Sequence, residues 1–140
     1  MSVYLDASVL VALLMVDALT ARADAFFRAN TPVLIVSDFA AAEFASAVAR
    51  RVRTGDITAD EARSGFSAFD SWTARATLRE ETMTADIRAA EAFLRRLDLS
   101  LRTADALNIA IAQRIRASLV TFDERIAASA RVLGIHVVEA

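Results

Sequence analysis

A length of 140 residues, 56% of them hydrophobic, with three glycines and one proline, predicts one folded domain over residues 1–140 and excludes a disordered or fibrous chain. The chain has no cysteine, no lysine and one histidine, His136, which excludes disulfides, thiolate zinc sites, P-loops, Schiff-base enzymes and His-rich metal sites. Its formal net charge of −2 argues against indiscriminate nucleic-acid binding but is compatible with a local positive groove.

The first half of the chain alternates short apolar runs with helical patterns. A strand that ends at Asp6 comes first, and Ser37 or Asp38 is expected to cap a long helix that Gly55 stops. Thr58 and Glu61 form a capping box for the next helix. We expect strands over 3–5 and 33–36, and helices over 7–16, 20–29, 38–53 and from 58 past Trp72.

The second half continues the alternation. Thr103 is expected to cap one of its helices, and Gly134 to end another. In the helix that starts at Thr84, four apolar residues at helical spacing predict the buried face: Ile87, Ala90, Leu94 and Leu97. We expect strands over 77–80, 119–122 and 135–138, and helices over 84–97, 103–115 and 124–132.

Short apolar strands that alternate with helices indicate an α/β fold with three layers (α/β/α) around a central, mainly parallel sheet of four or five short strands. In such sheets the ligand site lies beyond the carboxyl ends of the strands, where the strand order reverses. No apolar run could span a bilayer, and no basic residues precede Val9–Val16 to make it a signal peptide. We therefore expect a soluble, cytoplasmic protein with no membrane partner.

Two aspartates, Asp6 and Asp123, stand at or just after predicted strands. For either one alone, the simpler interpretation is an N-cap of the following helix, because Asp is among the preferred N-cap residues. Two such residues in one small sheet make it less plausible that both are only caps.

Two further acids lie in apolar helices. Glu43 is the only charged residue between Phe39 and Ala49, so its carboxylate should be buried or face a cleft, which is costly without a cation. Asp105 lies in a similar run, although an acid in the first turn of a helix is also favoured by the helix dipole.

Clustered carboxylates without His or Cys suit a hard cation, Mg²⁺ or alternatively Mn²⁺. Such a site can activate a water, orient a phosphodiester and stabilise a leaving oxygen. Ser8 and Thr121 carry hydroxyls beside the two strand-end acids and could hold a metal-bound water, or could be ordinary turn and strand polarity.

The acids and their flanking residues resemble the PIN domain in order and approximate spacing, and more narrowly a VapC-type toxin of a bacterial toxin–antitoxin pair. The resemblance covers the chain from Val3 to the final strand. It rests on Asp6 in Tyr-Leu-Asp-Ala-Ser, Glu43 in Ala-Ala-Glu-Phe, Asp105 in Thr-Ala-Asp-Ala-Leu-Asn-Ile-Ala and Asp123 in Thr-Phe-Asp-Glu-Arg.

This resemblance implies a Mg²⁺-dependent endoribonuclease in which Asp6 and Asp105 are the firmest metal ligands. Glu43 and Asp123 would complete the site, and Thr121 would match the family's threonine. It also implies an RNA substrate, a VapB-type antitoxin and a homodimer. The alternatives are a PIN fold that has lost activity and serves as a protein-binding module, and a phosphatase that uses Asp6 as its nucleophile.

Contacts to RNA are harder to assign from the sequence. The candidate arginines, which could equally be solvated surface charges, are Arg50, Arg51, Arg53, Arg75, Arg79 and Arg102. Trp72, Phe66 and Phe69 could stack on bases, although core or dimer packing is the simpler expectation. We expect His136 to be structural, and an antitoxin segment to bind between the helices over 39–52 and 62–72.

Overall fold

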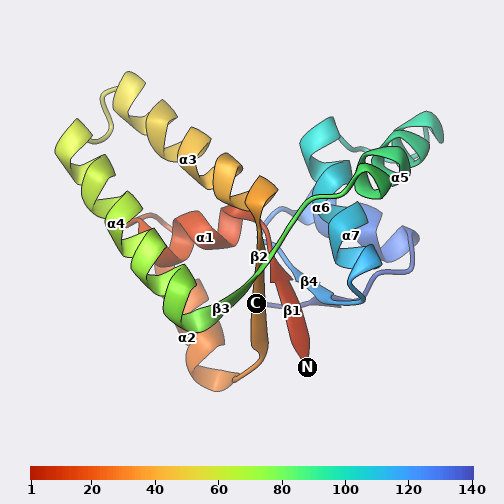
Figure 1. The fold of residues 1–140 in the computed structure, drawn as a ribbon, viewed down its shortest axis with the longest axis horizontal. Coiled ribbons are helices and arrows are strands. Elements are labelled where there is room, and N and C mark those ends of the chain that lie inside the picture. The colour runs from red at the N-terminus through yellow and green to blue at the C-terminus, as the bar shows by residue number, and fades with distance from the viewer.

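A computed structural model describes residues 1–140. Figure 1 shows the elements in their spatial arrangement. In chain order they are β1 (Ser2–Leu5), α1 (Ala7–Leu14), α2 (Thr20–Ala29), β2 (Val33–Ser37), α3 (Asp38–Arg53), α4 (Ala59–Ala76), β3 (Thr77–Glu80), α5 (Thr84–Arg95), α6 (Thr103–Arg114), β4 (Ser118–Val120), α7 (Glu124–Val132) and β5 (Val137–Val138).

The five strands form one sheet in the order β3-β2-β1-β4-β5, and every neighbouring pair is parallel. The predicted α/β fold with a mainly parallel sheet is therefore confirmed, with parallel pairing throughout. The chain starts at the central strand, adds β2 and β3 on one side, and then returns to add β4 and β5 on the other side. The strand order thus reverses between β1 and β4, where a ligand site is expected in such a sheet.

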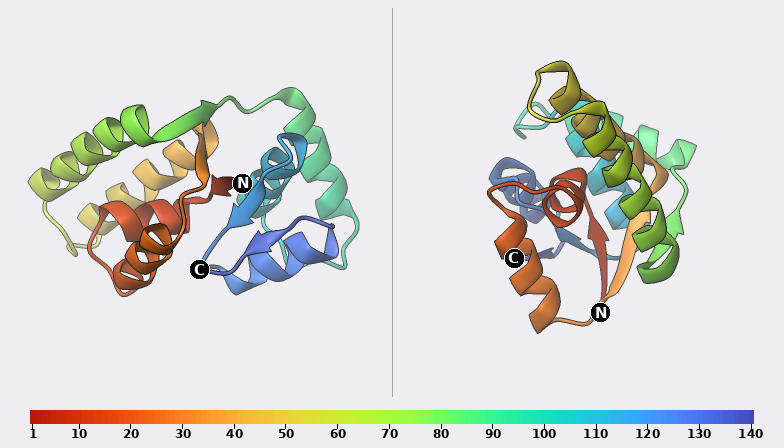
Figure 2. Two further views of the ribbon diagram at one scale, coloured as in Figure 1. Left: turned by 90° about the horizontal axis from the view of Figure 1, so that it is seen from below. Right: turned by 90° about the vertical axis from the view of Figure 1, so that its left-hand side faces the viewer.

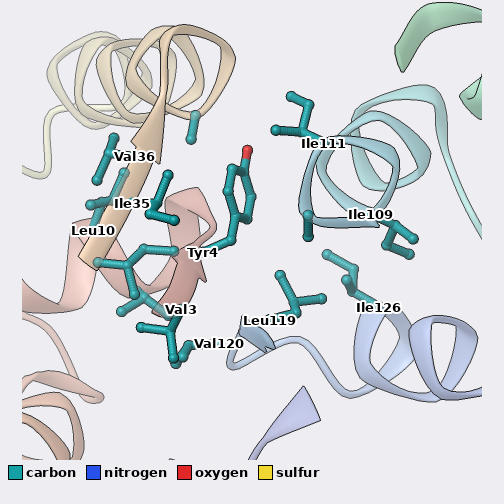
Figure 3. Close-up of a cluster of buried hydrophobic side chains, with 14 of the residues drawn as sticks. Val3, Tyr4, Leu10, Ile35, Val36, Ile109, Ile111, Leu119, Val120 and Ile126 are labelled. Carbon is teal, nitrogen blue, oxygen red and sulfur yellow. The ribbon is translucent and has the colours of Figure 1, made fainter. Parts of the chain in front are cut away.

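Helices cover both faces of the sheet (Figure 2). Helices α1 to α4 pack against one another on one side, and α5 to α7 pack on the other. The core between them contains all of β1 after its first residue, so Val3, Tyr4 and Leu5 are fully buried. Figure 3 shows Tyr4 between the apolar side chains of the sheet and those of α6. No helix of the structure is both long and apolar enough to cross a membrane.

The expected helices and strands are all present, and the differences lie at their ends. Helix α1 stops at Leu14 because Met15 is extended, which leaves Val16 94% exposed. Helix α5 stops at Arg95, and β4 and β5 are shorter than predicted. Two expectations about α5 and α6 were wrong. Arg102 rather than Thr103 is the N-cap of α6. Ile87 and Leu97 are 55% and 89% exposed rather than buried, and Leu97 lies beyond the helix with a positive φ of 68°.

The buried side of α5 contains Ala90 and Leu94, as predicted, and also an ion-pair cluster. Asp86 is 1% exposed and accepts hydrogen bonds from the Arg114 guanidinium at 2.7 and 3.0 Å. The same guanidinium donates to Glu80 and to the backbone carbonyl of Glu81, both at 2.9 Å. Arg114 therefore fastens the end of α6 to the connection between β3 and α5. Since Asp86 is almost completely buried, losing Arg114 would leave the Asp86 charge uncompensated.

Candidate active site

The four acids singled out in the sequence come from elements that meet at the carboxyl edge of the sheet. Asp6 follows β1 directly, and Asp123 is the N-cap of α7, shortly after β4. Glu43 is on α3, the helix that follows β2, and Asp105 is in the first turn of α6. Because β1 and β4 are neighbours, Asp6 and Asp123 lie on either side of the position where the strand order reverses.

Asp6 is the most deeply buried of these acids, with 2% of its surface exposed. Its Oδ1 accepts a hydrogen bond from the Ser8 hydroxyl at 2.5 Å and one from the Val9 backbone N–H at 3.2 Å. Its Oδ2 accepts a hydrogen bond from the Thr121 hydroxyl. Burial raises the pKa of Asp6 above the ordinary Asp range, although the hydrogen bonds from Ser8, Thr121 and Val9 act in the opposite direction.

Ser8 and Thr121 both support Asp6, because each donates its single hydroxyl proton to that carboxylate. Their expected role in holding a metal-bound water stays a prediction. The same two hydroxyl oxygens accept hydrogen bonds at 3.1 Å, from the backbone N–H groups of Phe122 and Asp123 respectively. Through these contacts they join the start of α1 to the segment after β4. In the structure they support Asp6 and fix its position relative to Asp123.

Glu43 is half-buried on α3 and is held by Asn108 of α6, whose amide nitrogen lies 2.6 Å from Oε1. Burial is the largest cause of the raised pKa of Glu43, and the negative charges of Asp6 and Asp105 raise it further, whereas the Asn108 hydrogen bond lowers it. Asp6 and Asp105 thus lie close enough to Glu43 for their charges to act on its carboxylate.

The three aspartates also act in the caps of helices, so the interpretation of each as a residue that stabilises a helix start is correct. Asp6 accepts from the first turn of α1, and Asp123 accepts from the N–H groups of Arg125 and Ile126 in α7. Asp105 accepts from the Arg102 N–H at 2.9 Å. In each case the contact satisfies backbone donors that a helix start leaves unpaired. Glu43 has no such capping contact.

Three residues of the site were missed in the sequence. Asn108 supports Glu43, and the Tyr4 hydroxyl donates to Asn108 Oδ1 at 2.5 Å. Ser37 Oγ in turn lies 2.6 Å from the Tyr4 hydroxyl. One signal was available, because Asn108 is the only polar residue between Asp105 and Gln113. Ser37 was considered only as a cap of α3, a role that it has.

The donor set fits a hard divalent cation, because it consists of carboxylate and hydroxyl oxygens and contains neither imidazole nor thiolate. No three acidic, histidine or cysteine side chains are grouped so that they alone could hold a metal ion as a closed set of ligands. Mg²⁺ is commonly bound by one or two carboxylates together with waters and substrate phosphates, and such a site needs no closed set. The role of the four acids as metal ligands stays a prediction.

Two small hollows adjoin the acids. One, of about 220 Å³, is lined by Glu43, Ser46, Ala47 and Arg50. The other, of about 250 Å³, includes Ser8, Ala47, Arg50 and Arg51 in its lining. Of the candidate arginines, Arg50 borders both hollows, and Arg51 forms an ion pair with Asp17 at 3.3 Å. Neither hollow is lined by the other four, Arg53, Arg75, Arg79 and Arg102.

The aromatic candidates pack in or against the core, whereas His136 lies at the surface. Phe69 is 6% exposed and stacks on Phe44 with 4.6 Å between ring centroids, and Phe66 meets Phe44 edge-on at 6.3 Å. Trp72 is partly buried against the same core. His136 precedes β5, and its Nδ1 lies 2.9 Å from Ser118 Oγ. The expectation that the aromatic residues serve packing is confirmed for Phe66, Phe69 and Trp72. The structural role expected of His136 is not supported, because this residue is exposed and lies outside the strand.

Known structures share this fold over nearly the whole chain. VapC20 of Mycobacterium tuberculosis, described as a sarcin-ricin loop cleaving toxin, aligns with a TM-score of 0.77 and 19% identity over 99% of both chains. VapBC2 from Rickettsia felis, solved with a DNA fragment from their promoter, aligns with a TM-score of 0.70 and 14% identity over 99% of this chain and 98% of that chain. FitAcB from Neisseria gonorrhoeae aligns with a TM-score of 0.66 and 15% identity over 98% of this chain and 96% of that chain.

These structures are less than 25% identical to the chain in sequence, so the similarity to them shows only that the fold is shared. A comparison with curated proteins found no match. A sequence model of the family known as the PIN domain, however, matches residues 3–132, which include all four acids. The chain therefore belongs to the PIN domain family.

Proposed function

We propose that the chain is a metal-dependent endoribonuclease of the VapC type, the toxin of a toxin–antitoxin pair. The observation that carries the proposal is the buried Asp6 carboxylate. It lies where the strand order reverses, between two hydroxyls that fix both of its oxygens, and it is electrostatically coupled to Glu43. A carboxylate held in this way is costly to the fold unless a cation offsets it. The phosphatase alternative is disfavoured because such an enzyme usually needs a second aspartate two residues after the first, where this chain has Ser8, and a lysine, which this chain lacks.

In this proposal Asp6 and Asp105 hold Mg²⁺ or Mn²⁺, and Glu43 and Asp123 complete the site. When bound, the cation supplies the positive charge that orients a phosphodiester and makes water a nucleophile near neutral pH. The chain's own contribution is to keep the carboxylates ionised and in place. Ser8 and Thr121 do this for Asp6 by donating hydrogen bonds to its charged form.

For the substrate, we propose that Arg50 binds an RNA phosphate next to the acids. It is an exposed residue that borders both the hollow at Glu43 and the hollow at Ser8. Its neighbour Arg51 is less available, because it is paired with Asp17. A guanidinium at this place would attract the phosphate backbone locally, despite the overall charge of −2.

For the partner, we propose that an antitoxin segment binds a groove of about 550 Å³ between the end of α1, the end of α3 and α4. Its lining includes apolar Leu14, Met15, Val16 and Ile57, together with Asp60 and Glu61. Gly65 lets the Met15 side chain pack closely against α4, since a Cβ there would come within 2.6 Å of Met15 Sδ. Phe66 and Trp72 do not line it, so Phe and Trp side chains of this chain are not its anchors.

The groove also adjoins the hollow at Ser8, because Arg51 lines both, and Ser8 contacts Asp6. A helical or extended apolar segment in the groove could place a basic side chain, most suitably Arg, against the carboxylates. That side chain would compete with the metal ion. The homodimer that the resemblance implies stays a prediction, and it is compatible with antitoxin binding.

We expect Asp6→Asn and Asp105→Asn to remain folded and to lose RNA cleavage, with the rate falling by more than about a hundredfold, beyond the range typical of residues that only support a metal ligand. Each variant removes one charge and keeps an oxygen that can accept the capping hydrogen bond. The measurement is cleavage of a panel of structured RNAs by the antitoxin-free chain, with Mg²⁺ and with EDTA. Glu124→Gln, which changes an exposed acid in the first turn of α7, is the control and should cut normally. Native rates in both aspartate variants would support the alternative of a protein-binding module.

Arg50→Ala should raise the KM for RNA by about tenfold and change kcat little, because a charged hydrogen bond to phosphate contributes on the order of 1.5 kcal/mol. Arg95→Ala is the matched control, since Arg95 is an exposed arginine on α5 that pairs only with Glu91. Steady-state cleavage at two salt concentrations would separate the two variants. An equal effect of both substitutions would mean that Arg50 acts only as part of the general surface charge.

We expect the product of the small open reading frame adjoining the gene to co-purify with the tagged chain and to suppress its toxicity. Val16→Glu should abolish this complex and leave RNA cleavage intact, because Val16 is 94% exposed at the groove and is not an acid of the site. Val132→Glu, at a position that is 61% exposed on α7, should bind normally. The proposal fails if the wild-type chain forms no complex and is harmless when induced alone.

A further inference from the structure

A series of buried, hydrogen-bonded side chains lies next to the acids and ends at Glu43. Tyr4 and Ser37 are fully buried, and Asn108 is 2% exposed. Ser37 Oγ lies 2.6 Å from the Tyr4 hydroxyl, that hydroxyl donates to Asn108 Oδ1 at 2.5 Å, and Asn108 Nδ2 donates to Glu43 Oε1 at 2.6 Å. In Figure 3 the Tyr4 hydroxyl points away from Val3, Leu119 and Val120 of the core below it.

The donor and the acceptor of every hydrogen bond in this series follow from the groups that face one another. Asn108 Nδ2 faces two acceptors, Glu43 Oε1 and the Ala104 carbonyl oxygen. If the amide were turned over, its oxygen would face both of these acceptors and no hydrogen bond could form. Asn108 Oδ1 can only accept, and the Tyr4 proton must therefore point toward it. The Ser37 hydroxyl, which accepts from the Ala40 N–H at 2.9 Å, then donates to Tyr4. Burial raises the pKa of Tyr4, so the phenol stays protonated.

The chain of hydrogen bonds connects the elements that carry three of the acids. Tyr4 stands two residues before Asp6 on β1, and Asn108 stands three residues after Asp105 on α6. Ser37 caps α3, the helix that carries Glu43. Packing alone does not need this arrangement, because phenylalanine and leucine would fill the same space without polar atoms to satisfy. All the polar atoms involved are satisfied, which makes a buried network rigid.

We propose that Tyr4 and Asn108 are positioning residues of the metal site, which hold Glu43 by its Oε1 and leave its Oε2 to the cation. The inference rests on the proposed function, since it gives Glu43 a role in binding a metal. Neither residue touches the substrate or the metal. Their effect passes through the Glu43 carboxylate, whose rotation within the half-buried site they prevent.

The experiment measures Mn²⁺ affinity without RNA, by titration followed with electron paramagnetic resonance. Tyr4→Phe removes only the hydroxyl, and Asn108→Leu removes the donor to Glu43 at similar volume. Each should weaken Mn²⁺ binding by about tenfold, the usual effect of a residue that supports a metal ligand. Thr73→Val is the control: it removes a hydroxyl on a residue that is 4% exposed and that donates to the Asp70 carbonyl, in the part of α4 that precedes β3. It should bind Mn²⁺ as the wild type does.

A double-mutant cycle with Glu43→Gln separates positioning from general destabilisation. Tyr4→Phe should have no further effect on Mn²⁺ affinity once Glu43→Gln is present. Wild-type affinity in both Tyr4→Phe and Asn108→Leu, together with weakened binding in Glu43→Gln, would overturn this inference and leave the proposed function standing. An equal loss in both backgrounds would overturn it too. If the wild type binds no Mn²⁺, or Glu43→Gln binds as well as the wild type, the metal role of Glu43 fails and this inference falls with it. Circular dichroism checks that each variant is folded. If Tyr4→Phe does not fold, the same cycle is measured with Asn108→Leu.

Discussion

The desolvation of the Asp6 carboxylate is the constraint on which the rest of the site depends. With 2% of its surface exposed, Asp6 has lost nearly all contact with water, and the hydrogen bonds from Ser8, Val9 and Thr121 offset only part of that cost, so its pKa remains raised. Those donors come from the first turn of α1 and from the segment after β4. The pairing of β1 with β4 therefore brings the donor from the segment after β4 to Asp6. A divalent cation at this edge of the sheet would favour the ionised form that the site otherwise penalises.

The acids could be predicted from the sequence because each differs from its immediate surroundings. Glu43 is a lone charge in an apolar helix, and Asp6 and Asp123 follow short apolar runs. The alternation of strand and helix patterns likewise predicted the parallel sheet, since each pattern is local. The capping interpretation and the site interpretation were treated as alternatives, yet Asp6, Asp105 and Asp123 cap helices and also lie at the candidate site. Parallel strands lead into helix starts at one edge of the sheet, so both roles fall on the same residues.

The contacts that escaped prediction join residues far apart in the sequence. Asn108 and Glu43 are 65 residues apart, and Tyr4 and Asn108 are 104 apart, so no local pattern pairs them. The same holds for Asp86, which is buried by Arg114, 28 residues further along the chain. Helical spacing placed Ile87 on the buried face of α5, but Asp86 occupies that face beside Ala90, and Ile87 is exposed. Periodicity detects an amphipathic helix, whereas a buried salt bridge depends on its tertiary partner.

The most direct test of this account is the stability of the wild type and of Asp6→Asn, followed by thermal unfolding across pH with EDTA or with Mg²⁺. Because the native pKa of Asp6 is raised, the native state binds a proton more tightly than the unfolded chain, and the wild type loses stability as pH rises from the ordinary Asp range through the raised value. In EDTA at neutral pH, Asp6→Asn should be at least as stable as the wild type. Its advantage should disappear as pH falls below the ordinary Asp range, and Mg²⁺ should raise the Tm of the wild type alone. The account would be contradicted if Asp6→Asn were less stable than the wild type in EDTA at neutral pH and if Mg²⁺ stabilised both proteins equally or stabilised neither.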